Sequence, residues 1–201
     1  MKTRHCSLAV SLLLAPTLSH AHHAMGGKTP STLFEGLLSG FAHPVIGLDH
    51  FLFVLAIGAA CYAFRRGAGT AVAFVAATIV GTALHLNRAD VPYAEVWVAA
   101  TLIVAGIALL RATPRLAGAA AGAFIALAGV FHGYAYGESI VGAETTPLAA
   151  YLVGFTLIQL AIAYGGYSLA RVLDRRSVDV PRAFGGALSL AGAIFLALAF
   201  V

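Results

Sequence analysis

The sequence predicts an all-α membrane protein in which six transmembrane helices follow a cleavable signal peptide. Of its 201 residues, 60% are hydrophobic and only 10% are charged, and the mean hydropathy is +0.90. Water-soluble domains carry about 25% charged residues, so a soluble globule is excluded, and the apolar composition also excludes disorder. Twenty-two glycines in this background are typical of membrane helices, in which small residues let backbones approach closely.

Residues 1–21 have the three parts of a secretory signal peptide. Lys2 and Arg4 form a positively charged start, and a short apolar stretch follows them. The tripeptide Ser-His-Ala at 19–21 is a small-x-small cleavage site. The apolar stretch is too short to cross a bilayer, which takes roughly 20 residues. We therefore expect a mature transmembrane domain of residues 22–201 that begins outside the cytoplasm.

Six apolar runs follow, and each is long enough for a helix through about 30 Å of hydrocarbon. Lipid offers the backbone no hydrogen bonds, so we expect every run to be helical. The runs are 34–62, 69–87, 93–110, 116–136, 147–170 and 183–201. Glycines of the fourth run and its edges are expected to form packing seams, namely Gly118, Gly122, Gly129, Gly133 and Gly137.

The charges between these runs predict the orientation of the chain. With the N-terminus outside, the outer connections hold only Lys28 and Arg88. The cytoplasmic connections hold Arg65, Arg66, Arg111, Arg115, Arg171, Arg175, Arg176 and Arg182. This positive-inside asymmetry predicts a multi-pass protein of the bacterial inner membrane with both termini in the periplasm. The net charge of +4 forms no continuous basic patch, so nucleic-acid binding is not expected.

Polar groups inside an apolar run are costly, and they mark functional sites. The first run contains the segment HPVIGLDH, which supplies His43, Asp49 and His50. On an unbroken helix the two histidines share a face but lie about 10 Å apart along the axis. Pro44 lacks a backbone N–H and Gly47 is permissive, so we expect a break that brings His43 towards Asp49 and His50. Alternatively, the proline only kinks the helix and each polar group bonds a neighbouring helix.

Further candidate ligands gather towards the outer side. His132 lies near the end of the fourth run with Glu138 just beyond it, while His85 ends the second run and Glu95 begins the third. His85 and Glu95 are equally consistent with interfacial anchors or capping residues. This distribution predicts a funnel for a cation that narrows towards the first run.

The donor types indicate which cation would suit. Imidazole and carboxylate ligands favour borderline divalent metals such as nickel, cobalt, zinc and copper. Magnesium and calcium prefer all-oxygen shells, and the site offers no thiolate for copper(I). At the mature N-terminus, His22 and His23 would add a capture site or form an untied polar end.

These motifs resemble those of the HupE/UreJ family of nickel and cobalt permeases. HPVIGLDH matches the family signature HPxxGxDH, and Phe131-His132-Gly133 with a following glycine and glutamate resembles its fourth-helix motif. The segment VPYAE at 91–95 resembles the entry to its third helix. The resemblance covers essentially the whole mature chain.

The resemblance implies a secondary permease, without enzymatic activity or a prosthetic group, that carries Ni²⁺ or Co²⁺ inward. It would supply hydrogenase, urease or cobalamin-linked proteins. The residues that it assigns to metal recognition are His43, Asp49, His50, His132 and Glu138. Two positions depart from the family pattern. Tyr136 stands where members often have a second histidine, and the family glutamate is often one place later than Glu138, so Glu144 competes as the carboxylate ligand.

Two other classes stay open at this point. A membrane electron-transfer subunit would bind haem between His132 and either His43 or His50, although Asp49 and Pro44 argue against that reading. An intramembrane metal hydrolase would need a water-activating site, and the sequence has no HExxH motif. The choice between nickel and cobalt, the energy coupling and the formation of a homo-oligomer are also left open.

Overall fold

The structure is a computed structural model that describes residues 28–111 and 119–200. The expected signal peptide at 1–21, the capture residues His22 and His23, and Gly118 lie outside the described residues. The described part of the chain is all-helical. This agrees with the all-α part of the predicted fold class.

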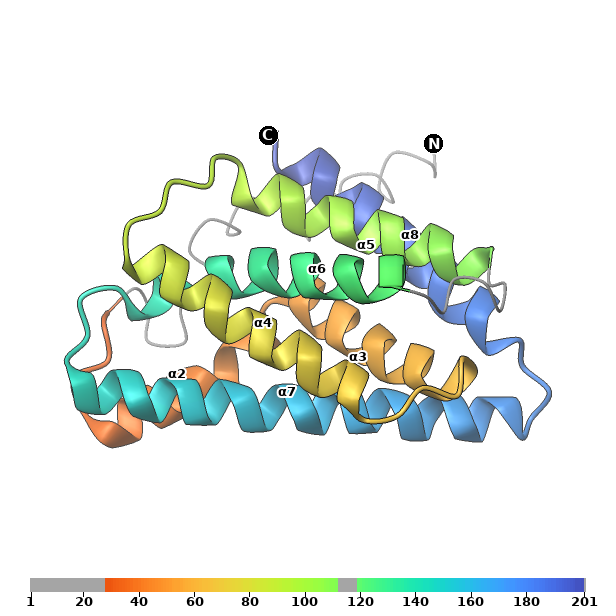
Figure 1. The fold of residues 1–201 in the computed structure, drawn as a ribbon, viewed down its shortest axis with the longest axis horizontal. Helices are drawn as coiled ribbons and strands as arrows, with labels where there is room; N and C mark the ends of the chain where they lie inside the picture. Colours follow the sequence, from red (N-terminus) through yellow and green to blue (C-terminus); the bar gives the residue numbers. More distant parts are fainter. Residues whose placement is uncertain (1–27, 112–118, 201) are drawn as a thin grey trace, which may run out of the picture.

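The helices follow the predicted runs in order, with the first run divided in two (Figure 1). They are α2 (Leu33–Ile46), α3 (Leu48–Ala63), α4 (Gly69–Leu86), α5 (Ala94–Leu110), α6 (Ala119–Gly137), the 3₁₀ helix η2 (Glu138–Ile140), α7 (Thr145–Asp174) and α8 (Val180–Leu198). Side chains cap two of the starts. Thr32 and Glu35 form a capping box on α2, and the Asp179 side chain accepts from the Arg182 N–H on α8.

The predicted break in the first run is present, and it lies at Gly47. The axes of α2 and α3 are bent by 79° at this point. Gly47 has φ −70° and ψ 95°, which are not helical values. Pro44 lies inside α2, and the helix continues for two further residues, Val45 and Ile46, before the chain leaves it. The proline therefore lies next to the break without forming it.

The described residues include three helices long and apolar enough to cross a membrane, namely α4, α7 and α8. The bent pair α2 and α3 is a fourth when it forms one span. Helix α5 is apolar but has only 17 residues. These helices indicate a multi-pass membrane protein.

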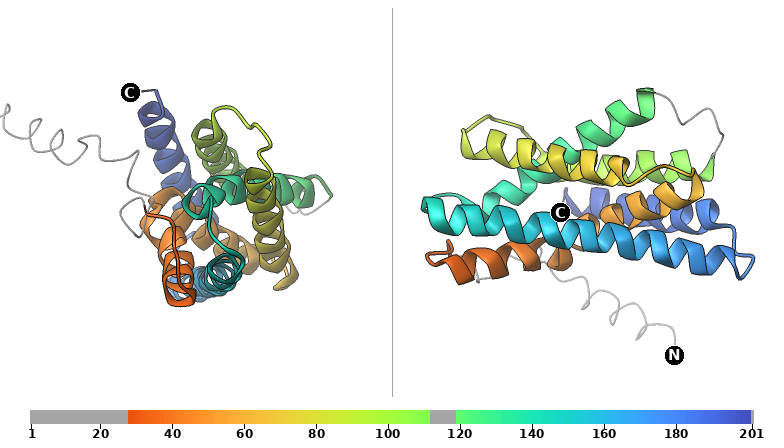
Figure 2. Two further views of the ribbon diagram at one scale, coloured as in Figure 1. Left: turned by 90° about the vertical axis from the view of Figure 1, so that its left-hand side faces the viewer. Right: turned by 60° about the horizontal axis from the view of Figure 1, so that its bottom comes forward.

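Helix α7 is a long helix against which α2 and α3 pack. It has 30 residues; α2 packs on its first half and α3 on its second half (Figures 1 and 2). Helix α4 crosses α6, and α5 packs against α8. At the α2–α7 contact, a Cβ added to Gly40 would collide with the Tyr151 backbone, so the glycine lets these helices touch.

The two ends of the bundle differ in charge. The α3–α4 and α7–α8 connections lie at one end, opposite the α4–α5 and α6–α7 connections (Figure 1). The first end carries Arg65 and Arg66 as well as Arg175 and Arg176, whereas the α4–α5 connection carries Arg88. The fold thus groups the described connections in the way that the positive-inside prediction requires.

The glycine seam predicted on the fourth run is confirmed in part. Gly129, Gly133 and Gly137 each lie against α4 or its end, whereas Gly122 faces open space and its prediction is wrong. A Cβ at Gly133 would collide with the backbone of Thr78. The seam is therefore confined to the C-terminal half of α6.

We expect Gly133→Ala to destabilise the protein although alanine is the better helix former. Alanine gains about 1 kcal/mol of helix propensity over glycine, but overpacking against backbone costs about 1–3 kcal/mol and forces α4 and α6 apart. Gly122→Ala is the matched control and should be neutral or stabilising, because nothing lies within 4 Å of its added Cβ. Thermal unfolding of the two purified variants in detergent measures the difference. Equal melting temperatures would contradict the close α4–α6 contact.

Candidate metal site

A small cavity of about 60 Å³ gathers most of the predicted ligands. Residues of α2, α3, α4, α5, α6 and η2 line it, so segments far apart in the sequence meet there. The donor residues that line it are His43, Asp49, His50, His85, Glu95 and Glu138. His132 is not among the lining residues, but its ring bonds His50 directly.

The break at Gly47 brings the two histidines of the first run together. The ring centroids of His43 and His50 are 5.9 Å apart, whereas an unbroken helix would separate these residues by about 10 Å along its axis. Both side chains are buried. The approach expected from the sequence is therefore present.

His50, His132 and Thr101 form a buried chain of hydrogen bonds whose directions can be assigned. The Thr101 hydroxyl donates its single proton to the Val98 carbonyl, at 2.6 Å. It must therefore accept from Nε2–H of His132, at 3.0 Å. A neutral imidazole has only one N–H, so Nδ1 of His132 accepts from Nδ1–H of His50, at 2.8 Å. The lone pair of the His50 ring is then on Nε2.

His43 is oriented by a second buried chain. Its Nδ1 lies 2.7 Å from the Ser139 hydroxyl, and that hydroxyl lies 3.1 Å from the Tyr151 hydroxyl. Tyr151 in turn donates to the Tyr136 carbonyl, at 2.8 Å. One tautomer that satisfies this chain has His43 donating to Ser139 and Ser139 donating to Tyr151. This arrangement leaves the lone pair of His43 on Nε2, the form in which imidazole binds metals.

The Tyr136 ring contacts a histidine of each chain. Its ring centroid lies 5.0 Å from that of His43 and 4.5 Å from that of His50. Its hydroxyl is buried and makes no hydrogen bond within the described part of the chain. The Tyr136 ring therefore packs against both imidazoles, while its hydroxyl has no assigned role.

The carboxylates differ in their surroundings. Asp49 lies in the first turn of α3, where its Oδ1 accepts the His50 backbone N–H at 2.8 Å. Glu95 and Glu138 are exposed although both line the cavity. Glu144 is the exposed N-cap residue of α7 and is not a lining residue. The geometry therefore favours Glu138 over Glu144.

His85 faces the cavity from the end of α4. Its ring lies 4.5 Å from the Tyr134 ring between centroids, and its Nδ1 is buried without a hydrogen bond to any described residue. A Cβ on Gly137 would lie 2.6 Å from that of His85, so the glycine makes room for this imidazole. A buried nitrogen without a partner is available to a ligand.

The donors surround the cavity without forming a closed coordination shell. Among the described residues, no three His, Cys, Asp or Glu side chains lie close enough together to hold one ion. His50 and His132 direct one nitrogen each at the other. An ion would bind here only if some of these side chains exchanged their present contacts for it.

The geometry offers no place for a haem between His50 and His132. Two nitrogens on one iron would be about 4 Å apart, given metal–nitrogen bonds of about 2 Å, whereas these Nδ1 atoms are 2.8 Å apart. The adjoining cavity of about 60 Å³ is also too small for a porphyrin, because pockets for ligands of that kind have about 300–1,000 Å³.

Sequence reasoning missed the residues that orient the histidines. These are Thr101, Ser139 and Tyr151. Thr101 is a polar side chain inside the third apolar run, and Ser139 follows Glu138 directly. A search for every polar group in the runs would have found Thr101, and a search of the residues next to Glu138 would have found Ser139. A search confined to ionisable groups passes over both.

Comparisons with known proteins identify the family of the chain. The family model described as HupE / UreJ protein matches residues 9–195. A curated relative, protein HupE of Rhizobium leguminosarum bv. viciae, is 28% identical over 201 residues, which cover 98% of this chain and 99% of the relative. No solved structure is significantly similar to the chain. Because the family model covers nearly its whole length, the chain belongs to the HupE/UreJ family.

Proposed function

We propose that this protein is a secondary permease that carries Ni²⁺ or Co²⁺ from the periplasm into the cytoplasm. Membership of the HupE/UreJ family supports a role of the nickel/cobalt transporter type. The observation that carries the proposal is the cavity on which six imidazole and carboxylate side chains converge. Such ligands suit borderline divalent metals.

In this proposal the exposed carboxylates attract the ion and the buried histidines bind it. Glu95 and Glu138 raise the local concentration of cations at the mouth of the cavity. A cavity of about 60 Å³ holds only a few water molecules. The ion therefore exchanges part of its hydration shell for Asp49 and the Nε2 atoms of His43 and His50. Ligands must be strong enough for this exchange and weak enough to release the ion.

Release on the other side requires a rearrangement, because aromatic side chains lie beyond the histidines. The buried ring of Phe53 lies 4.4 Å from that of His132 and 5.4 Å from that of Phe74, measured between centroids. We propose that α3 moves relative to α2 about Gly47 and takes Phe53 out of the path. An inside-negative potential favours entry of a cation by ~2.3 kcal/mol per charge per 100 mV, so a facilitator needs no other coupling.

The proposal includes the membrane topology. After cleavage behind residue 21, six helical passes place both termini in the periplasm and the arginine-bearing connections in the cytoplasm. The supporting observations are the grouping of these connections at one end of the bundle (Figure 1) and the position of Glu95 and Glu138 towards the opposite end. The imported ion would supply nickel or cobalt enzymes such as hydrogenase or urease.

Uptake of ⁶³Ni²⁺ and ⁵⁷Co²⁺ by cells that express the chain tests this function. We expect Asp49→Ala to lower uptake at least about tenfold at equal abundance, since a lost charged ligand costs more than about 1.4 kcal/mol. Glu144→Gln is the matched control, because it removes an exposed carboxylate outside the cavity, and it should retain uptake. Undiminished uptake by Asp49→Ala would overturn the site. Lack of uptake of both ions by the inserted wild type would overturn the function.

A further inference from the structure

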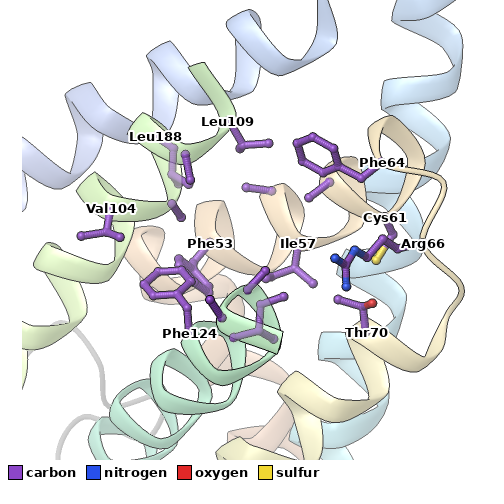
Figure 3. Close-up of a pocket in the computed structure, with 17 residues that line it drawn as sticks. Phe53, Ile57, Cys61, Phe64, Arg66, Thr70, Val104, Leu109, Phe124 and Leu188 are labelled. Carbon is purple, nitrogen blue, oxygen red and sulfur yellow. The ribbon is translucent and has the colours of Figure 1, made fainter. Parts of the chain in front are cut away.

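A second, larger cavity shares no lining residue with the candidate metal site and adjoins it at Phe53, whose ring packs on His132. Its volume is about 280 Å³, and α3, α5 and α6 form most of its walls (Figure 3). The lining is almost entirely apolar, with Phe53, Ile57, Phe124 and Leu188 among its larger side chains. Apolar cavities of about 150 Å³ already take up a molecule such as benzene, so this one is large enough for part of a hydrocarbon chain.

One end of the cavity carries a positive charge. The guanidinium of Arg66 points into the space beside Cys61 and Thr70 (Figure 3). Its Nη2 is buried and has no hydrogen-bond partner among the residues that the structure describes. A buried charged donor without a partner is costly, so the position indicates an anionic ligand that is not part of the fold. A divalent cation would be repelled here.

The cavity lies where a membrane lipid could enter it. Arg66 belongs to the connection between α3 and α4, at an end of the bundle (Figure 1), which is the depth expected for a lipid headgroup. Val104 lines the cavity and is 49% exposed, and Ala120 in the facing wall is also exposed. The apolar space therefore reaches the lipid-facing surface between α5 and α6.

We propose that this cavity binds an acyl chain of an anionic membrane phospholipid, with the phosphate held by Arg66. Guanidinium and phosphate form paired, charge-assisted hydrogen bonds, which satisfy the buried Nη2. The acyl chain fills the apolar walls between Phe53 and Leu109 and excludes water from them. The lipid thereby fixes the ends of α3 and α5 relative to α6.

Native mass spectrometry of the full chain in mild detergent measures lipid retention. Phosphatidylglycerol and a diacylglycerol with the same acyl chains are the two probes, and only the first has a phosphate. We expect retention of phosphatidylglycerol and about tenfold less of it in Arg66→Gln, because hydrogen bonds to charged groups contribute about 1.5–3 kcal/mol. Arg65→Gln is the matched control, since Arg65 is exposed in the same connection and is not a lining residue.

The buried thiol of Cys61 gives a second measurement that needs no Arg66 variant. Cys61 lines the cavity and is 5% exposed, and a Cys6→Ser background leaves it as the sole thiol. Bound phosphatidylglycerol should slow its alkylation by N-ethylmaleimide severalfold, whereas inorganic phosphate should not. Equal retention of both lipids, equal loss in the two arginine variants, or protection by inorganic phosphate alone would overturn the proposal.

Discussion

His50→Ala is expected to reduce Ni²⁺ and Co²⁺ uptake to the level of cells without the transporter. The substitution removes the imidazole that lines the cavity and that bonds His132 on the neighbouring helix. It also leaves the buried Nδ1 of His132 without its donor, a loss of about 1–3 kcal/mol. His50→Gln keeps an amide donor for that nitrogen and removes the imidazole ligand, so a defect shared by both variants is a defect in metal binding.

Tyr136→Phe is the control within the same cluster. It deletes a buried hydroxyl that makes no hydrogen bond among the described residues and keeps the ring that packs against His43 and His50. Its uptake should stay within about twofold of the wild type, since loss of an unbonded group leaves no orphaned partner. Full transport by His50→Ala, or a defect in Tyr136→Phe as severe as that of His50→Ala, would contradict this view of the cluster.

The order of the helices could be predicted because lipid imposes one backbone solution on every apolar run. Each of the six runs contains a helix of the structure. The exact place of the break could not be predicted, because either Pro44 or Gly47 can interrupt a helix. The break lies at Gly47, which takes φ −70° and ψ 95° and redirects the chain. Pro44 remains inside α2.

The metal-ligand donors of the candidate site could be predicted from the sequence, but the hydrogen-bond partners of its histidines could not. The six donors that line the cavity were all visible as ionisable groups at the outer ends or in the interior of apolar runs. Their partners were not visible, because the contact between His50 and His132 joins residues 82 positions apart. Both interpretations of the first run hold in part. The helix is broken, and each histidine also bonds a group on another segment.

Thr101→Val is expected to weaken metal binding although residue 101 is not a lining residue of the cavity. Valine has the shape of threonine without the hydroxyl that accepts Nε2–H of His132. His132 then has no acceptor for this proton, and the alternative tautomer puts a proton on Nδ1, where it meets Nδ1–H of His50. The His50 ring then loses the orientation that this chain of hydrogen bonds gives it. Groups that orient a metal-binding imidazole contribute about 10–100-fold in affinity.

The concentration dependence of uptake separates this positioning role from a general structural one. Thr101→Val should raise KM for Ni²⁺ about 10–100-fold with a smaller change in maximal rate, and Thr101→Ser should restore the wild-type KM because it keeps the hydroxyl. Abundance and melting temperature of the two purified variants provide the control for folding. Two outcomes would contradict this role: a serine variant as defective as the valine variant, or an unchanged KM in Thr101→Val. Either would show that the 3.0 Å hydrogen bond between Thr101 and His132 does not control metal binding through the orientation of His50.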